Sequence, residues 1–355
     1  MAHASGSKRR SVFFSRHPAR AALVTPENMN MRRSAEMGGD TSMSVTLNRA
    51  RHPKLKRTLR SIARNWDLYL LLVPVLAYFI IFHYAPMYGV QIAFRRYSIR
   101  KGILGSQWVG MAHFNRFFQS YYFERLLVNT LTISLYNLAL GFPLPILLAL
   151  LLNEVTSKRY KKLVQTITYA PHFLSAVVLV SIINAMFSTS TGIINNLIVL
   201  FGGEKVAFTT DPRIFKSLYV LSGVWQNMGW NSIIYMAALS GIDPTLYEAG
   251  RVDGASRWQM LWRITLPCLA PTICIMLILQ CGRLMSLGYE KIYLMQNDLN
   301  IAASEVISTY VYKSGLINAE YSFSTAVGLF NSVINCILLF TVNFITGKLS
   351  DTRIF

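Results

Sequence analysis

Long apolar runs recur along this chain and are separated by shorter polar segments. A hydrocarbon core of about 30 Å needs roughly 20 helical residues to cross it, and six runs are that long. They lie at 67–87, 127–152, 163–187, 216–241, 268–289 and 326–347. The pattern predicts an all-α, polytopic membrane protein with six transmembrane helices.

Composition agrees with this class. Hydrophobic residues make up 53% of the chain and charged residues only 14%, whereas soluble domains carry about 25% charged residues. The cysteines all fall in predicted spans, without a Cys-x-x-Cys pair or a neighbouring histidine. They are Cys268, Cys274, Cys281 and Cys336. We interpret them as small packing residues and expect neither a disulfide framework nor a metal site.

The net charge of +19 is concentrated before the first span, where basic residues cluster at 49–64. Basic residues mark the cytoplasmic ends of membrane helices and attract anionic lipid, so this charge does not indicate a nucleic-acid partner. We expect a cytoplasmic N-terminus and, with six spans, a cytoplasmic C-terminus. Residues 1–60 lack an apolar period and are predicted to form a disordered basic cytoplasmic tail, with the membrane domain at 61–355.

The segment 88–126 falls outside the cell in this topology and combines many aromatic residues with an excess of positive charge. Its basic residues are Arg95, Arg96, Arg100, Lys101, Arg116 and Arg125, against one acidic residue, Glu124. Aromatic residues outside the bilayer favour packing or an interfacial belt. We expect a small folded cap that offers a contact surface to an acidic ligand or partner, although a simple connection remains open.

Prolines interrupt the second predicted span at Pro143 and Pro145. A proline inside a helix removes a backbone hydrogen bond and bends the helix. We therefore expect a bend here. Such bends lie beside the substrate path in some transporters and are inert in other membrane proteins, and the sequence leaves both roles open.

The segment between the fourth and fifth predicted spans has the signals of two short helices. Asp243 is followed by Pro244, which is typical of an N-cap and a first helical position. Asp253-Gly254 predicts a tight turn. Beyond it an apolar stripe at i, i+3 and i+4 runs through Trp258, Leu261 and Trp262. We expect two helices that meet at an angle on the cytoplasmic side.

The residues of this loop carry a family resemblance. They include Glu248, Ala249, Gly250, Asp253, Gly254 and Ala255, and then Trp258, Leu261, Ile264 and Pro267. The arrangement resembles the EAA loop of bacterial ABC-transporter permeases, so 243–267 is interpreted as an ATPase-coupling loop; the alternative is a loop that lies on the lipid surface. The family usually has alanine where this chain has Gly250, which loosens the first helix by about 1 kcal/mol.

The resemblance extends over roughly 65–355. Further matching stretches are 141–143, 149–155, 169–175, 288–291 and 326–330. Together they resemble the carbohydrate-uptake branch of these permeases, which transports oligosaccharides and polysaccharides, including complex plant or algal saccharides such as alginate.

The resemblance implies a type I ABC importer permease fold in a bacterial inner membrane. It implies as partners a second, homologous permease in a heterodimer, two ATPase subunits and an extracytoplasmic solute-binding protein. The sequence contains no Gly-x-x-x-x-Gly-Lys-Ser/Thr phosphate loop, so ATP and Mg²⁺ are expected on the ATPase subunits and no cofactor on this chain. We expect a transport subunit and not an enzyme.

Polar residues inside predicted spans are costly and therefore informative. They are Asn227, Trp230 and Asn231 in the fourth span, Gln280 and Arg283 in the fifth, and Asn331 and Asn335 in the sixth. Amides beside aromatic rings are typical of saccharide binding, and interhelical hydrogen bonds are the alternative. Arg283 either meets a carboxylated substrate or pairs with Glu290 or a partner subunit.

Arg283 and the basic external segment together favour an acidic, uronate-containing oligosaccharide as substrate. A permease for neutral oligosaccharides is the alternative. An amino-acid or peptide permease is disfavoured because it shares the coupling loop but not the stretches at 169–175 and 288–291. A stand-alone membrane protein is the remaining reading.

Overall fold

The computed structural model describes residues 64–349. The predicted tail at 1–60 and the far C-terminus lie outside the described residues. Contacts divide the chain into two units, Met1–Tyr69 and Leu70–Phe355, and the packing described below is that of the second. Over the described range the elements are helices, with one two-stranded hairpin.

The first helical segment runs without a break from Trp66 to Phe94 and covers the first predicted span. It changes hydrogen-bonding pattern along its length and consists of α2 (Trp66–Phe79), the π-helix η1 (Ile80–Tyr84), α3 (Ala85–Met87) and the 3₁₀-helix η2 (Tyr88–Phe94). The apolar part is exposed throughout, because none of its most hydrophobic window is buried in the chain.

Three further helical segments are long and apolar enough to cross a membrane. The first consists of α6 (Tyr122–Gly141) and α7 (Pro143–Glu154). The second consists of α13 (Arg257–Met260), the π-helix η4 (Leu261–Thr265) and α14 (Leu266–Cys281). The third is α18 (Tyr321–Leu349). A bend was expected at Pro143 and Pro145. The helix is interrupted only at Phe142, between α6 and α7, and Tyr122–Glu154 remains one candidate span.

The span predicted at 163–187 is broken into two helices. The chain forms α8 (Lys158–Tyr169), the 3₁₀-helix η3 (Ala170–Phe173) and α9 (Ala176–Phe187), and the two halves meet at 103°. Pro171 cannot donate a backbone hydrogen bond, which weakens the helix there. Ser175 then starts a new helix, since its hydroxyl accepts a hydrogen bond from the Val178 amide at 3.3 Å.

The fourth predicted span is a 29-residue helix, α11 (Pro212–Ser240). Its interior is too polar for it to count among the candidate spans. By length and apolarity alone, four helices of the described residues could cross a membrane, or five if the bent pair counts as one span.

The fifth predicted span ends earlier than expected, because α14 ends at Cys281 and not near residue 289. The Met285 amide donates to Oδ1 of Asn335 at 2.9 Å, so a side chain of α18 satisfies this amide in place of a helical carbonyl. Short elements follow the break: α15 (Tyr289–Met295), α16 (Ile301–Ser304), α17 (Ile307–Tyr312) and the π-helix η5 (Lys313–Ile317).

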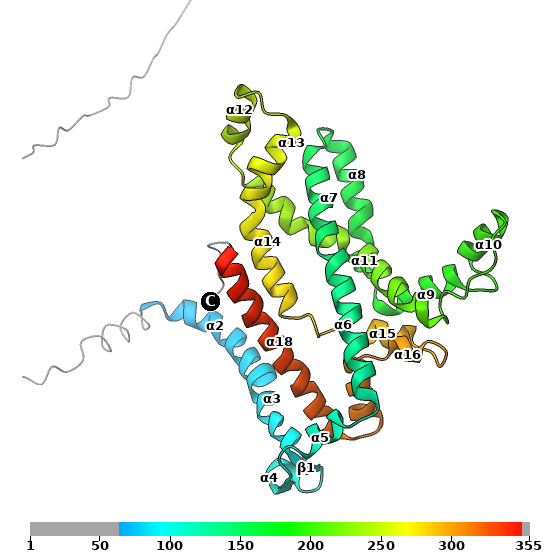
Figure 1. Cartoon of the computed structure of the whole chain (residues 1–355). Helices are drawn as coiled ribbons and strands as arrows, with labels where there is room; N and C mark the ends of the chain where they lie inside the picture. The colour runs from blue at the N-terminus through cyan, green and yellow to red at the C-terminus, as the bar shows by residue number, and fades with distance from the viewer. Residues whose placement is uncertain (1–63, 350–355) are drawn as a thin grey trace, which may run out of the picture. The chain divides into compact units, whose positions relative to one another are not determined.

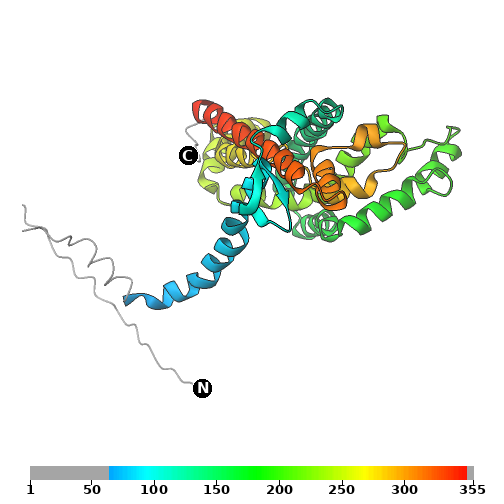
Figure 2. The same cartoon turned by 90° about the horizontal axis from the view of Figure 1, so that it is seen from below.

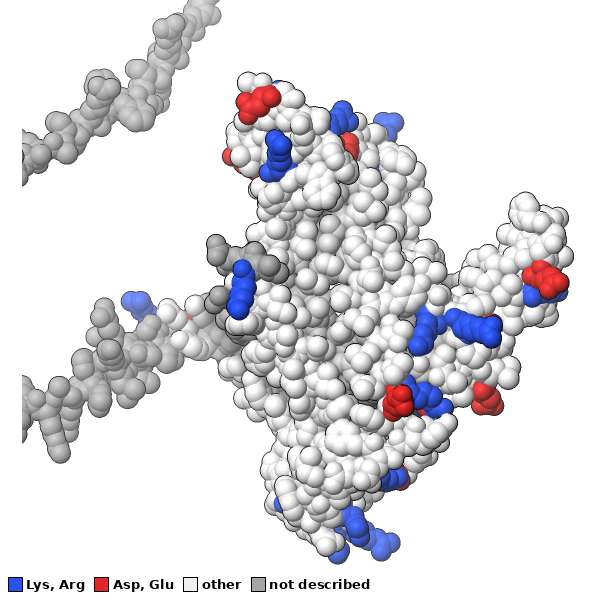
Figure 3. All heavy atoms as spheres, in the orientation of Figure 1, with Lys and Arg blue, Asp and Glu red and all other residues white. Residues whose placement is uncertain are grey.

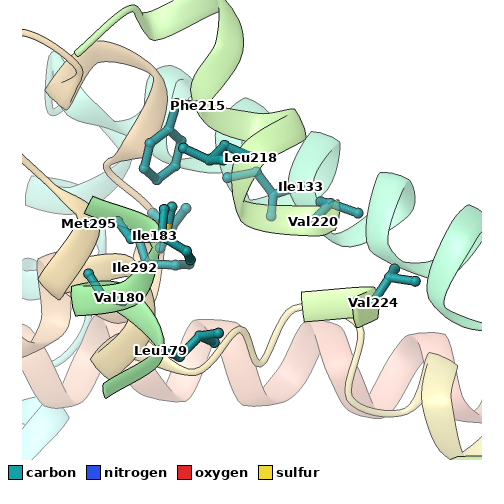
Figure 4. Packing of buried hydrophobic residues seen from close by; sticks show 11 residues of the cluster. Ile133, Leu179, Val180, Ile183, Phe215, Leu218, Val220, Val224, Ile292 and Met295 are labelled. Carbon is teal, nitrogen blue, oxygen red and sulfur yellow. The ribbon is translucent and has the colours of Figure 1, made fainter. Parts of the chain in front are cut away.

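The largest hydrophobic core joins four helices (Figure 4). It contains Ile133 of α6, Leu179, Val180 and Ile183 of α9, Phe215, Leu218, Val220 and Val224 of α11, Ile292 and Met295 of α15, and Val306. α9 packs against α15, and Figure 2 shows α10 (Ile193–Leu200) extending beyond them. This core holds both broken regions, α8–α9 and α14–α15, against the long helix α11.

The segment 88–126 forms the small folded cap that the sequence predicted. Strands β1 (Arg95–Ser98) and β2 (Ser106–Trp108) pair antiparallel around α4 (Gly102–Gly105), and α5 (Ala112–Phe118) follows. Phe114 and Ala93 pack against Ala326 of α18. In Figure 1 this cap lies at the opposite end of α14 and α18 from helix α12 (Pro244–Val252).

Internal contacts use half of the cap's basic residues. Arg116 pairs with Glu320 at 3.0 Å, Arg125 pairs with Glu305, and Arg95 donates to the carbonyls of Leu104 and Ser106. The expected contact surface for an acidic ligand or partner is therefore reduced to Arg96, Arg100 and Lys101, which are all exposed.

Candidate functional site

Helix α12 begins and ends through local signals. The carboxylate of Asp243 accepts a hydrogen bond from the Thr245 amide at 2.9 Å, which lowers the pKa of Asp243. At the other end the amides of Gly254 and Ala255 donate to the carbonyls of Arg251 (3.1 Å) and Gly250 (2.9 Å). This pair of bonds is a Schellman motif, which requires a left-handed residue after the helix. Gly254 supplies it with φ of 73°, so the predicted turn is confirmed.

The predicted second short helix is wrong in its extent, because it is the beginning of the fifth span. Residues Arg257–Cys281 form one continuous helical segment. Its start is a capping box: the Ser256 hydroxyl accepts from the Gln259 amide, and the Gln259 side chain accepts from the Ser256 amide. A displacement at Arg257 is therefore carried directly into a membrane helix.

Contacts hold α12 against this segment. The hydroxyl groups of Tyr247 and Thr265 lie 3.1 Å apart, within hydrogen-bond distance. A β-carbon on Gly250 would lie 3.2 Å from Cδ1 of Ile264. The glycine that departs from the family pattern thus stands where the two helices approach closely, and an alanine there would require the end of the Ile264 side chain to shift by a few tenths of an ångström.

The outer face of the loop is open to solvent. Glu248, Ala249, Asp253, Gly254, Trp258 and Pro267 are exposed, whereas Gly250, Ala255, Leu261 and Ile264 are half-buried. Trp258 has 67% and Val252 88% of its surface exposed. Apolar side chains exposed beside charged ones mark a protein-binding surface more often than a solvated one. A cleft of about 480 Å³ adjoins this face, lined by Glu154, Glu248, Arg251 and Arg257 among others.

Charge is distributed unevenly over the face in Figure 3. Acidic and basic side chains gather around α12 and at the lower and lateral parts, and the surface of the long helices between them is almost free of charge. This distribution suits an apolar belt between two aqueous ends.

Two polar cavities lie along the long helices. The first, of about 230 Å³, is lined by Asn137, Gln226, Asn227, Asn231, Gln280 and Lys291 among others. The second, of about 180 Å³, is lined by three leucines and by Ser134, Asn137, Gln280, Arg283 and Ser286. Asn137 and Gln280 line both cavities. Neither lining contains an aspartate or a glutamate.

The structure brings only some of the predicted path residues to these cavities. Asn231, Gln280 and Arg283 line them. Asn227 also lines the larger cavity, but its side-chain amide is hydrogen-bonded to the Gly223 carbonyl (3.0 Å) and to Nδ1 of His172 (3.0 Å). Trp230 stacks on the His172 ring, with centroids 4.5 Å apart.

The two predicted path residues on α18 line neither cavity. Asn335 holds the break after α14, accepting from the Met285 amide and donating to the Ser286 hydroxyl at 2.8 Å. Asn331 has a buried side-chain oxygen with no hydrogen-bond partner in the described chain.

Arg283 lies just beyond the end of α14 and not well inside a span as predicted. Its side chain forms no salt bridge with Glu290 or any other carboxylate of residues 64–349. Lys291 was not singled out as a path residue from the sequence, because it lies in the stretch 288–291 that matches the family pattern. The ammonium of Lys291 donates to the Tyr219 carbonyl at 3.0 Å and lies 4.7 Å from the Tyr219 ring centroid.

No group of three or more His, Cys, Asp or Glu side chains in the described part of the chain could hold a metal ion.

Residues 141–351 match the family described as binding-protein-dependent transport system inner membrane components. The chain belongs to this family. It is 45% identical over 302 residues to the polygalacturonan/rhamnogalacturonan transport system permease protein YteP of Bacillus subtilis, covering 85% of this chain and 94% of that protein. It is 44% identical over 297 residues to protein LplB of the same organism, covering 84% and 93%.

Two solved structures are similar over nearly their whole length. One is a bacterial ABC transporter involved in the import of the acidic polysaccharide alginate, with a TM-score of 0.77 and 42% identity over 83% of this chain and 99% of that chain. The other is a bacterial alginate ABC transporter in complex with alginate pentasaccharide-bound periplasmic protein, with a TM-score of 0.78 and 42% identity over 84% and 100%. The predicted fold, that of a type I ABC importer permease, is confirmed, and this family member is a membrane subunit and not an enzyme.

Proposed function

We propose that this chain is one permease subunit of an ATP-driven, binding-protein-dependent importer of acidic oligosaccharides that contain uronate. Relatives named for polygalacturonan and for alginate support this substrate class. The observation that carries the proposal is the lining of the two cavities, which combines amides with Lys291 and Arg283 and contains no acidic side chain.

The chemistry of the linings fits such a substrate. Amide groups donate to and accept from sugar hydroxyls, and ammonium and guanidinium groups form charge-assisted hydrogen bonds with carboxylates. Unpaired cations beside membrane helices are costly. An anionic substrate would pair with these cations and offset this cost as it passes. A neutral sugar carries no charge and could not.

The other subunits of the importer follow from the family resemblance and from the ATP hydrolysis that such an importer needs. We propose that two ATPase subunits, which bind ATP and Mg²⁺, lie on the cytoplasmic side and that 243–267 seats in a groove of one of them. A second, homologous permease completes the path, and an extracytoplasmic solute-binding protein delivers the saccharide. Both termini then lie in the cytoplasm of a bacterium, and the protein is in the inner membrane. The exposed Trp258 and Val252 on the coupling face support docking of a soluble partner.

Coupling is tested in the complex copurified from the native host and reconstituted in liposomes. Glu248→Lys combined with Gly254→Asp is expected to abolish substrate-stimulated ATP hydrolysis, since it reverses an exposed charge and strains a left-handed turn. Glu204→Lys, an exposed charge reversal outside the coupling loop, is the control. Intact stimulation in the double variant, with the subunits still assembled, contradicts the coupling assignment.

Substrate class is tested with two oligosaccharides of equal length, an oligogalacturonate and its carboxyl-reduced neutral counterpart. Each is presented at saturating concentration on the copurified binding protein, and uptake and ATP hydrolysis are measured. The acidic compound is expected to give the greater uptake. Equal or greater uptake of the neutral compound favours the neutral-oligosaccharide permease instead.

A further inference from the structure

We propose that Lys291 and Arg283 are two separate carboxylate-binding positions in two adjoining cavities. The permease itself, and not only the binding protein, then selects acidic saccharides. This inference rests on the proposed function and deepens it. It is carried by the surroundings of the two cations, by their cavities and by the residues that join these cavities.

Lys291 has donors to spare. An ammonium carries three N–H donors, and one of them is used by the Tyr219 carbonyl. The Tyr219 ring covers one side of the group through a cation–π contact. No carboxylate among residues 64–349 pairs with it, and the residue lines the larger cavity. A cation held from one side by a carbonyl and a ring, and open on the other, is positioned to receive an anion.

Arg283 has the geometry for the second carboxylate. Its planar guanidinium presents a fork of donors that matches both oxygens of a carboxylate. The smaller cavity, which Arg283 lines, also contains Ser134, whose hydroxyl is buried and has no hydrogen-bond partner in the described chain. Only 2% of Ser134 is exposed. Buried polar groups almost always have a partner, so this hydroxyl points to a polar ligand or water in the cavity.

The two cavities succeed one another along α6. Ser134 lines the smaller cavity, Gly141 lines the larger one, and Asn137 lines both. These residues are spaced by three and four, which is about one helical turn or 5.4 Å per step. This step is of the same order as the length of one sugar ring. A chain of linked uronates can therefore meet Lys291 and Arg283 with different carboxylates, while Asn137 and Gln280 contact the hydroxyls between them.

A purely structural role for Lys291 makes a different prediction. Its bond to Tyr219 links α15 to α11, and loss of that link alone would impair transport of any saccharide. A role in charge selection impairs only the acidic one. The ratio of acidic to neutral transport in each variant, relative to the unmodified complex, therefore separates the two and cancels the preference of the binding protein.

The experiment uses the reconstituted complex and the same two oligosaccharides. Lys291→Gln and Arg283→Gln are each expected to lower acidic transport roughly tenfold, as for the loss of a charge-assisted hydrogen bond, and to leave neutral transport within about twofold. Lys291→Arg is expected to retain acidic transport. Lys313→Gln is the matched control, because its ammonium also lies over a tyrosine ring, that of Tyr293, but lines neither cavity.

The outcomes are distinct. If the unmodified complex does not prefer the acidic compound, the proposed function itself fails. If it does prefer it, but Lys291→Gln and Arg283→Gln lower both transports equally or neither, this inference alone is overturned. Arg283→Gln decides the matter if Lys291→Gln does not assemble, since Arg283 is exposed and forms no salt bridge within residues 64–349.

Discussion

Gly229 is the position at which a single added methyl group should be most damaging. It lies on α11 against α8, and a β-carbon there would be 2.2 Å from the Thr168 carbonyl oxygen and 2.9 Å from the Thr168 β-carbon. Ordinary contact begins near 3.4 Å. The obstacle is backbone and cannot rotate away, so Gly229→Ala requires α8 and α11 to separate by about 1 Å.

Overpacking of this kind costs about 1–3 kcal/mol, and a backbone obstacle favours the upper part of that range. We expect a melting temperature several degrees lower, together with weaker transport, because the same interface carries the stack of His172 on Trp230. The assay is thermal unfolding of the purified complex, followed by tryptophan fluorescence and by the fraction that remains monodisperse.

Gly328→Ala is the matched control for this prediction. Gly328 lies inside α18, and a β-carbon there meets nothing within 4 Å. Alanine is a better helix former than glycine by about 1 kcal/mol, so this variant should melt at the same temperature or slightly higher. The reasoning is refuted if Gly229→Ala and Gly328→Ala melt together.

Three other substitutions test contacts outside the cavities. Arg125→Gln leaves the largely buried Glu305 carboxylate unpaired and should destabilise by about 3–5 kcal/mol, whereas adding Glu305→Gln should restore much of the melting temperature. Asn195→Leu removes bonds to both the amide and the carbonyl of Val206; about 2–3 kcal/mol of local stability should be lost, seen as faster proteolysis near Val206 only. Ser256→Ala removes the capping box and should cost about 1 kcal/mol, and an unchanged melting temperature would contradict that role.

The turn and the helix start within 243–267 were predictable because their signals are local. Asp243 caps the start of α12 by accepting from the Thr245 amide, and Gly254 supplies the left-handed residue just past the C-cap Asp253. Neither signal depends on the rest of the fold. The continuity of the second helix with α14 was not predictable in this way. The fifth span was predicted to begin at residue 268, but the π-helix Leu261–Thr265 leads into α14 without a break.

The breaks in the spans were missed because they depend on distant side chains. An apolar run at 163–187 meets the length criterion for a span, yet Gln226 of α11 donates to the Leu174 carbonyl at 3.0 Å and satisfies a bend that hydropathy does not reveal. Asn335 does the same for Met285 after α14. Exposed backbone polar groups at membrane depth are tolerated only where such partners exist or where they line a polar cavity.

Polar residues that satisfy these breaks are less available to a substrate than those that do not. The sequence offers a set of amides on the predicted spans and cannot rank them, because an amide that supports a break and an amide that binds a sugar are the same residue type. In the structure Asn227, Gln226 and Asn335 spend their hydrogen bonds within the chain. Gln226 and Asn227 also line the larger cavity. Asn231 and Gln280 line the cavities beside the two cations and form no side-chain hydrogen bond with other described residues. Substitution of the first group should therefore disturb folding and transport of every saccharide, and substitution of the second should change affinity for the saccharide without loss of assembly.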